Sequence, residues 1–137
     1  MDAAAARPKT ASTTEDAPVV TLVQQLLEQA VALKASDLHF EPYEHQYRVR
    51  MRIDGELREV ASLHMALKDR LASRIKVMSR LDIAEKRVPQ DGRMKLNLAD
   101  GRELDLRVST LPTLFGEKLV VRVLDSAQAQ LDLQRLG

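Results

Sequence analysis

The sequence contains no cysteine and no tryptophan. Without cysteine, disulfides, thiol chemistry and cysteine-ligated zinc or iron–sulfur sites are excluded. The 2 tyrosines and 2 phenylalanines are too few for a surface that stacks single-stranded bases. No apolar run approaches the roughly 20 residues that cross a bilayer, and no signal-peptide core follows Met1. We therefore expect a soluble cytoplasmic domain with no direct membrane span.

Signatures of catalysis are also missing. The motif G-x-x-x-x-G-K-[ST] is absent, and the 5 glycines are too scattered for a loop that cradles phosphates. The histidines, His39, His45 and His64, lack the spacing of metal ligands. No serine–histidine–acid arrangement can be assembled. We expect no catalytic residue, no metal and no bound cofactor in the isolated chain.

Charge is almost balanced. Lys and Arg number 21 against 20 Asp and Glu, so the net charge is +1. Hydrophobic residues make up 45% of the 137 residues, a composition typical of one globular domain. Bulk attraction to polyanions is excluded, and we expect no nucleic-acid partner. A nucleic-acid-binding face on a local row of arginines stays open as an alternative.

The composition divides the chain into three parts. Residues 1–17 have no large apolar side chain after Met1, which predicts a flexible linker. Patterned sequence begins at residue 18 and predicts one folded domain over 18–125. Residues 126–137 are mixed in character and are expected to be a connector.

Apolar residues have helical spacing over 19–33 and 64–81. Asp16 is expected to cap the first helix, with Pro18 in its first turn. In the second helix, Lys76 is expected on the outer, solvated face.

Strand signals alternate with a period of two residues, and Asp54-Gly55 and Asp100-Gly101 mark hairpin turns. The chain is expected to form a loop over 110–116. The element order α-β-β-β-α-β-β-β predicts an α+β fold, with a mostly antiparallel sheet of five or six strands and two main helices on one face or at its ends. Strands are expected over 35–42, 47–53, 56–60, 94–98, 104–109 and 118–124.

The arginines fall into two groups. Arg48, Arg50 and Arg52 form a row on one strand face, which fits either a solvated surface paired with acids or a surface for an anionic partner. Arg107 and Arg122 lie in strands with apolar neighbours, so we expect little water around them and a need for an anion. That anion is either an internal acid, with Asp105 or Glu117 as candidates, or a phosphate belonging to another domain.

The polar segment 85–93 contains an X-Pro bond, and loops of this kind are either plain turns or carry contacts between subunits. Arg87, Asp91 and Arg93 are therefore interface candidates, as are the arginines of the first group.

Several motifs occur together in an order that resembles a known family. They are ASDLHFEPYE (35–44), RVRMRIDGELREV (48–60), SRIKVMSRLDIAEKRVPQDGRMKL (73–96), LDLRVSTLPTLFGEKLVVRVLD (104–125) and LDLQRLG (131–137). Over about residues 16–137 the chain resembles the second N-terminal domain of type IV pilus assembly and type II secretion ATPases. The run TLPTLFGEK favours the pilus-extension ATPase.

The resemblance implies a PAS-like domain that precedes a RecA-like motor domain carrying the P-loop, which is missing here. It implies a hexamer that hydrolyses ATP with Mg²⁺ on the cytoplasmic side of the inner membrane and works with inner-membrane platform proteins. In the family this domain clamps over nucleotide, and its phosphate-contacting arginines carry over onto Arg107 and Arg122. The parent protein is then an ATP hydrolase, whereas the fragment alone is inactive. The remaining alternatives are a type II secretion ATPase domain and a PAS-like small-molecule sensor with an internal cavity.

Overall fold

A computed structural model of the chain describes residues 12–124. The predicted connector 126–137 and the first part of the predicted linker lie outside the described residues. Elements follow one another as predicted, two helices alternating with two groups of strands. They are α1 (Ser12–Ala32), β1 (Asp37–Pro42), β2 (Tyr47–Ile53), β3 (Glu56–Leu63), a 3-10 turn η1 (Met65–Leu67), α2 (Lys68–Met78), β4 (Gln90–Asn97), β5 (Glu103–Thr113) and β6 (Gly116–Leu124).

The strands form one 6-stranded sheet in the order β3-β2-β1-β6-β5-β4. Every neighbouring pair is antiparallel. The junction of β1 and β6 joins the first hairpin to the last, so segments distant in sequence lie side by side at the centre of the sheet. The predicted α+β fold with an antiparallel sheet is therefore confirmed, and a PAS-like arrangement is compatible with it.

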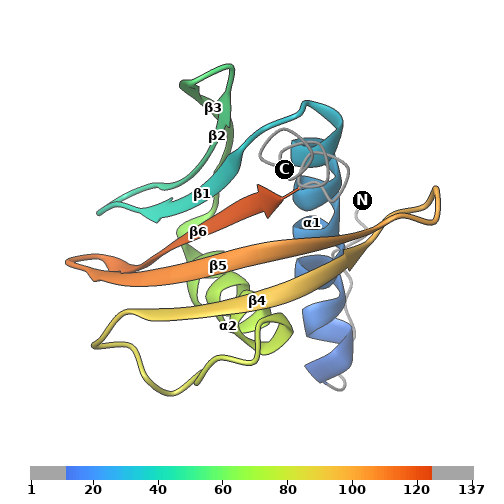
Figure 1. Ribbon diagram of the computed structural model, residues 1–137. Helices are drawn as coiled ribbons and strands as arrows, with labels where there is room; N and C mark the ends of the chain where they lie inside the picture. Colours follow the sequence, from blue (N-terminus) through green and yellow to red (C-terminus); the bar gives the residue numbers. More distant parts are fainter. Residues whose placement is uncertain (1–11, 125–137) are drawn as a thin grey trace, which may run out of the picture.

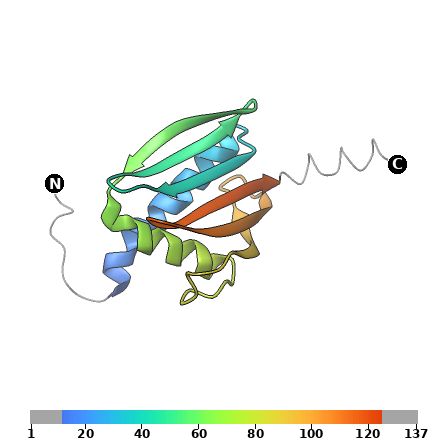
Figure 2. The same cartoon turned by 90° about the vertical axis from the view of Figure 1, so that its left-hand side faces the viewer.

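Both helices cover the same face of the sheet (Figure 1), and the view turned by 90° shows the opposite face left open (Figure 2). Side chains alternate along each strand, so one set is buried under the helices and the other points to the open face. Burial of each large apolar side chain contributes roughly 1.5–3 kcal/mol to folding. The core includes Leu38, Phe40, Val49, Met51, Leu96, Leu106, Val108, Leu119 and Val121 from the sheet and Val23, Leu27, Leu71 and Ile75 from the helices.

Three local predictions are wrong. α1 begins at Ser12, so Pro18 lies inside the helix and Asp16 is not its N-cap. Large apolar residues mark only the buried part of a helix, and the first turns of α1 have none, so periodicity could not detect them. β5 continues to Thr113 through the predicted 110–116 loop, which shrinks to a short turn.

The third wrong prediction is the outer position of Lys76, which is 1% exposed. Its ammonium pairs with Glu117 Oε1 on β6 at 2.7 Å and donates a hydrogen bond to the Glu85 carbonyl at 2.8 Å. A buried ammonium requires such partners, because desolvation of an unpaired charge is costly. The pair therefore ties α2 to the start of β6 and to the segment that leads into β4.

Candidate functional site

The strand register gathers arginines on the open face of the sheet. Arg93 of β4 lies opposite Arg107 of β5, and Arg107 lies opposite Arg122 of β6. Neighbouring strands are about 4.8 Å apart, so the backbones of these residues lie within roughly 10 Å of one another. We call Arg93, Arg107 and Arg122 the arginine row. Its next two register positions hold Asp37 of β1 and Arg52 of β2.

The arginine row is exposed and has no anionic partner among residues 12–124. Arg93, Arg107 and Arg122 are all exposed, and none makes a hydrogen bond or ion pair with any part of the chain that the structure describes. Like charges directly opposite one another destabilise a sheet. Guanidinium groups present planar forks of donors that match phosphate and carboxylate oxygens. The row can therefore accept an anionic group from outside the chain.

This geometry corrects the argument that first singled out Arg107 and Arg122. They are not short of water: both are exposed, and the buried residues next to them in the chain, Leu106, Val108 and Val121, point to the opposite face, under the helices. The suggested internal partners are not used either. Asp105 is exposed and makes no ion pair with any described residue, and Glu117 is committed to Lys76.

Arg48 and Arg50, by contrast, have partners within the chain. Arg50 donates two hydrogen bonds to Glu41, from Nε to Oε1 at 2.7 Å and from Nη2 to Oε2 at 2.8 Å. Arg48 lies over the Tyr43 ring, 4.7 Å from its centroid, and its Nε lies 3.5 Å from Glu41. Burial raises the pKa of Glu41, but hydrogen bonds from Arg50 and Lys118 outweigh it and hold that pKa at about 2. These contacts agree with a solvated, acid-paired face, and an interface role for these arginines stays a prediction.

Asp37, the acid beside the arginine row, is also engaged. Its oxygens accept from Ser36 Oγ at 2.8 Å and His39 Nε2 at 2.5 Å, and Arg52 Nε lies 3.4 Å away. Burial raises the pKa of Asp37, yet the contacts with His39, Ser36 and Arg52 prevail and lower it. Arg52 therefore belongs with the paired arginines.

The remaining interface candidates, from the segment 85–93, differ in their surroundings. Arg87 is exposed and binds its neighbour Glu85, through its backbone N–H at 2.8 Å and its Nε at 3.3 Å. Asp91 accepts a hydrogen bond from Ser109 Oγ at 2.6 Å. Only Arg93 of this segment joins the arginine row. The alternation of β4 and β5 around the Asp100-Gly101 turn was the signal that could have placed it there, because such a hairpin fixes the register.

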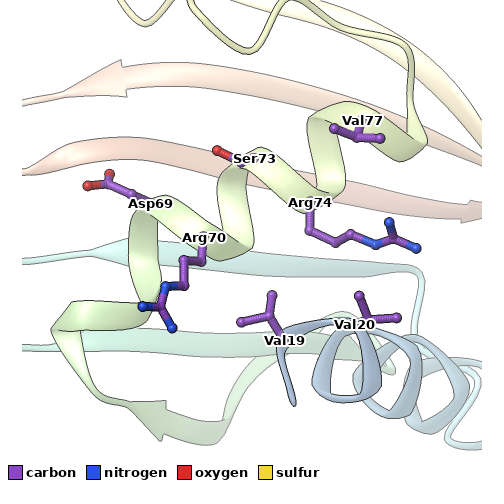
Figure 3. Close-up of a pocket in the computed structure, with 7 residues that line it drawn as sticks. All are labelled: Val19, Val20, Asp69, Arg70, Ser73, Arg74 and Val77. Carbon is purple, nitrogen blue, oxygen red and sulfur yellow. The ribbon is translucent and has the colours of Figure 1, made fainter. Parts of the chain in front are cut away.

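A surface groove of about 360 Å³ lies between the two helices, with its lining contributed by α1 and α2. Figure 3 shows its two walls, with valines from α1 facing a row of side chains on α2. The lining residues are Val19, Val20, Asp69, Arg70, Ser73, Arg74 and Val77. Because this groove opens at the surface, it differs from the internal cavity expected for a small-molecule sensor.

Two kinds of feature are absent from residues 12–124. No helix there is long and apolar enough to cross a membrane. No group of histidine and acidic side chains in the same range could hold a metal ion.

Comparison with known proteins places the chain in a family. A family profile described as "Type II/IV secretion system protein" matches residues 12–137. The type IV pilus assembly ATPase PilB of Acinetobacter baylyi is 56% identical over 90% of this chain, and that of Myxococcus xanthus is 52% identical over 93%. The type II secretion system protein E of Pectobacterium carotovorum is 52% identical over 90%. The chain spans only 21%, 22% and 24% of these relatives, respectively. The resemblance seen in the motifs is confirmed, and the chain belongs to the type II/IV secretion system protein family.

Proposed function

We propose that this chain is a domain of a hexameric ATPase that powers type IV pilus assembly. In the longer parent protein it clamps over ATP bound by a RecA-like motor domain and presents Arg107 and Arg122 to the phosphates. The observation that carries the proposal is the arginine row, where like charges lie opposite one another and pair with no acid in the part of the chain that the structure describes. The names of the relatives, which include pilus assembly ATPases, support the choice of ligand.

The strands supply the rigidity that such a contact needs. Arg107 and Arg122 project from β5 and β6, which pair along most of their length. Fixed donors stabilise charge that develops on phosphate oxygens without reorganising during the reaction. ATP supplies the phosphoryl group that is transferred to water. The arginines bind its oxygens and offset their negative charge, so closure of the domain depends on which nucleotide is bound.

The other parts of the proposal concern the parent protein. Its motor domain and the neighbouring subunits of the hexamer are the direct partners of this domain. The Mg²⁺ that accompanies ATP is held outside this domain. The parent acts in the cytoplasm, peripheral to the inner membrane, where it meets the platform proteins of the pilus.

A second candidate is the equivalent domain of a type II secretion ATPase. It is favoured by relatives named type II secretion system protein E, which are as similar to the chain as one of the pilus ATPases. Deletion of the parent gene decides between them. Loss of surface pili with normal protein secretion supports the pilus role, and the reverse result supports secretion.

ATP hydrolysis by the complete parent protein tests the role of the arginines. Arg107→Ala and Arg122→Ala are each expected to lower kcat/KM by roughly tenfold or more, about 1.4 kcal/mol of transition-state stabilisation, with the hexamer intact. Arg58→Ala is the matched control, because Arg58 is exposed on β3 outside the arginine row. Unchanged turnover in both Arg107→Ala and Arg122→Ala would contradict the proposal.

A further inference from the structure

The acidic residue in register with the arginine row is Asp37. It lies directly opposite Arg122 on one side and Arg52 on the other. A carboxylate between two guanidinium groups can pair with either of them, and such pairs are strong and often bidentate. If Asp37 paired with Arg122, it would offset part of the positive charge that the row offers to an anion.

The structure shows Asp37 held by Ser36, His39 and Arg52 rather than by Arg122. Oδ1 accepts from Ser36 Oγ at 2.8 Å, and Oδ2 accepts from His39 Nε2 at 2.5 Å. Arg52 lies 3.4 Å from Oδ2, whereas no ion pair joins Asp37 to Arg122. The Asp37 side chain is 7% exposed, so little water competes for these oxygens.

His39 makes the shortest of these contacts, and its ring makes no other hydrogen bond or ion pair with the described residues. Its side chain is 10% exposed, and its second ring nitrogen, Nδ1, is buried without a hydrogen-bond partner among residues 12–124. A carboxylate can only accept, so Nε2 carries the proton of the contact. Among the described residues, Asp37 is thus the one hydrogen-bond partner of the His39 imidazole.

We propose that His39 is a positioning residue that keeps the Asp37 carboxylate away from Arg122 and so leaves Arg122 available to phosphate. The identity of the ligand rests on the proposed function above. The positioning of Asp37 by His39 does not rest on the proposed function, because it follows from contacts within this chain.

Removal of His39 has a specific consequence. Oδ2 loses its closest donor while Arg122 stays at the neighbouring register position. The freed carboxylate turns to pair with Arg122 and competes with phosphate for the guanidinium. Substitution of Asp37 removes that competitor, so the effect of losing His39 depends on whether Asp37 is present.

The test uses the complete parent protein and a non-hydrolysable ATP analogue as the probe. His39→Ala is expected to raise the Kd of the analogue roughly three- to fivefold, the range of a partly solvated ion pair. Asp37→Asn is expected to leave the Kd near that of the wild type. The double variant His39→Ala/Asp37→Asn is expected to bind as well as Asp37→Asn alone. A double variant as weak as His39→Ala would overturn the proposal, since His39 would then act through packing.

Two further variants keep the proposal testable if His39→Ala does not fold. His39→Gln places an amide N–H where Nε2 lies and is expected to restore wild-type affinity. His39→Asn keeps a polar side chain that is too short to reach Asp37, so it replaces His39→Ala if that variant does not fold. Equal affinity of the Gln and Asn variants would contradict the positioning role.

A crystal structure of His39→Ala separates this proposal from the proposed function. We expect Asp37 and Arg122 within about 4 Å of each other, the limit of an ion pair. If that pair forms but Arg107→Ala and Arg122→Ala leave ATP turnover unchanged, the ligand is wrong and the positioning is right. If those variants lose activity but Asp37 does not turn toward Arg122, the positioning is wrong and the proposed function stands.

Discussion

Arginines on one sheet face have two different surroundings in this protein. Arg50 donates from Nε and Nη2 to the two oxygens of Glu41, whereas Arg107 and Arg122 lie opposite each other on neighbouring strands with no acid paired to them in residues 12–124. Sequence composition cannot distinguish them, since each lies in a strand with alternating apolar residues. The difference comes from which residues the register places opposite one another. An arginine without an internal partner is the one that can bind an external anion.

Glu41 gives a prediction at this scale. Its pKa is held at about 2, below the value of 4.5 for an unperturbed glutamate, by Arg50 and Lys118 against the opposing effect of burial. The folded state therefore binds the Glu41 proton less readily than the unfolded state does. The stabilisation from this carboxylate is complete above about pH 5 and is lost as the pH falls toward 2. Allowing for screening by solvent, we expect a loss on the order of 1–2 kcal/mol.

Urea denaturation of this chain at pH 6 and pH 3 measures the effect. Glu41→Gln is expected to be less stable than the wild type at pH 6 and to lose less stability between the two pH values. Glu44→Gln is the control, because Glu44 is 69% exposed and next to the same strand. Equal pH dependence of the wild type and Glu41→Gln would show that Glu41 is not held in its ionised form by these contacts.

At the scale of elements, the buried pair of Lys76 and Glu117 joins α2 to β6. Lys76→Met leaves the Glu117 carboxylate buried without its cation, which typically costs about 3–5 kcal/mol. We expect the free energy of unfolding to fall by that amount, measured by denaturation at neutral pH. Lys95→Met is the control, because Lys95 is exposed and lies 3.6 Å from Glu103.

The double variant Lys76→Met/Glu117→Gln tests the reason for this loss. Because it removes the uncompensated charge, we expect it to recover at least half of the lost stability. No recovery would mean that Lys76 stabilises α2 through its bond to the Glu85 carbonyl rather than through the ion pair.

The elements themselves could be predicted because their signals are local. Alternation and the Asp54-Gly55 and Asp100-Gly101 turns defined the hairpins, and the order of helices and strands was correct. The first turns of α1 and the burial of Lys76 could not be predicted. The former carry no large apolar residues, and the latter depends on Glu117, which is distant in sequence.

The candidate site was predictable only in part. The resemblance singled out Arg107 and Arg122, although the accompanying argument from burial was wrong. The place of Arg93 beside them depends on the pairing of β4 with β5, and the contact of His39 with Asp37 depends on side-chain packing. Neither relation can be predicted from the spacing of residues within a single segment.

At the scale of the whole molecule, the two faces of the sheet have different surroundings. One is packed against α1 and α2, and the other is left open (Figure 2). The arginine row lies on the open face. A rigid body with charged donors on one open face is suited to close over a bound anion and to release it. The proposed clamp therefore requires that this open face, rather than the helical side, meets the nucleotide.

The most direct test is a structure of the complete parent protein with a non-hydrolysable ATP analogue bound. We predict that the guanidinium groups of Arg107 and Arg122 lie about 3 Å from phosphate oxygens, as charge-assisted hydrogen bonds require. A closed, nucleotide-bound subunit whose phosphates meet neither arginine would contradict the account. The open face of the sheet would then have to serve a different anionic partner.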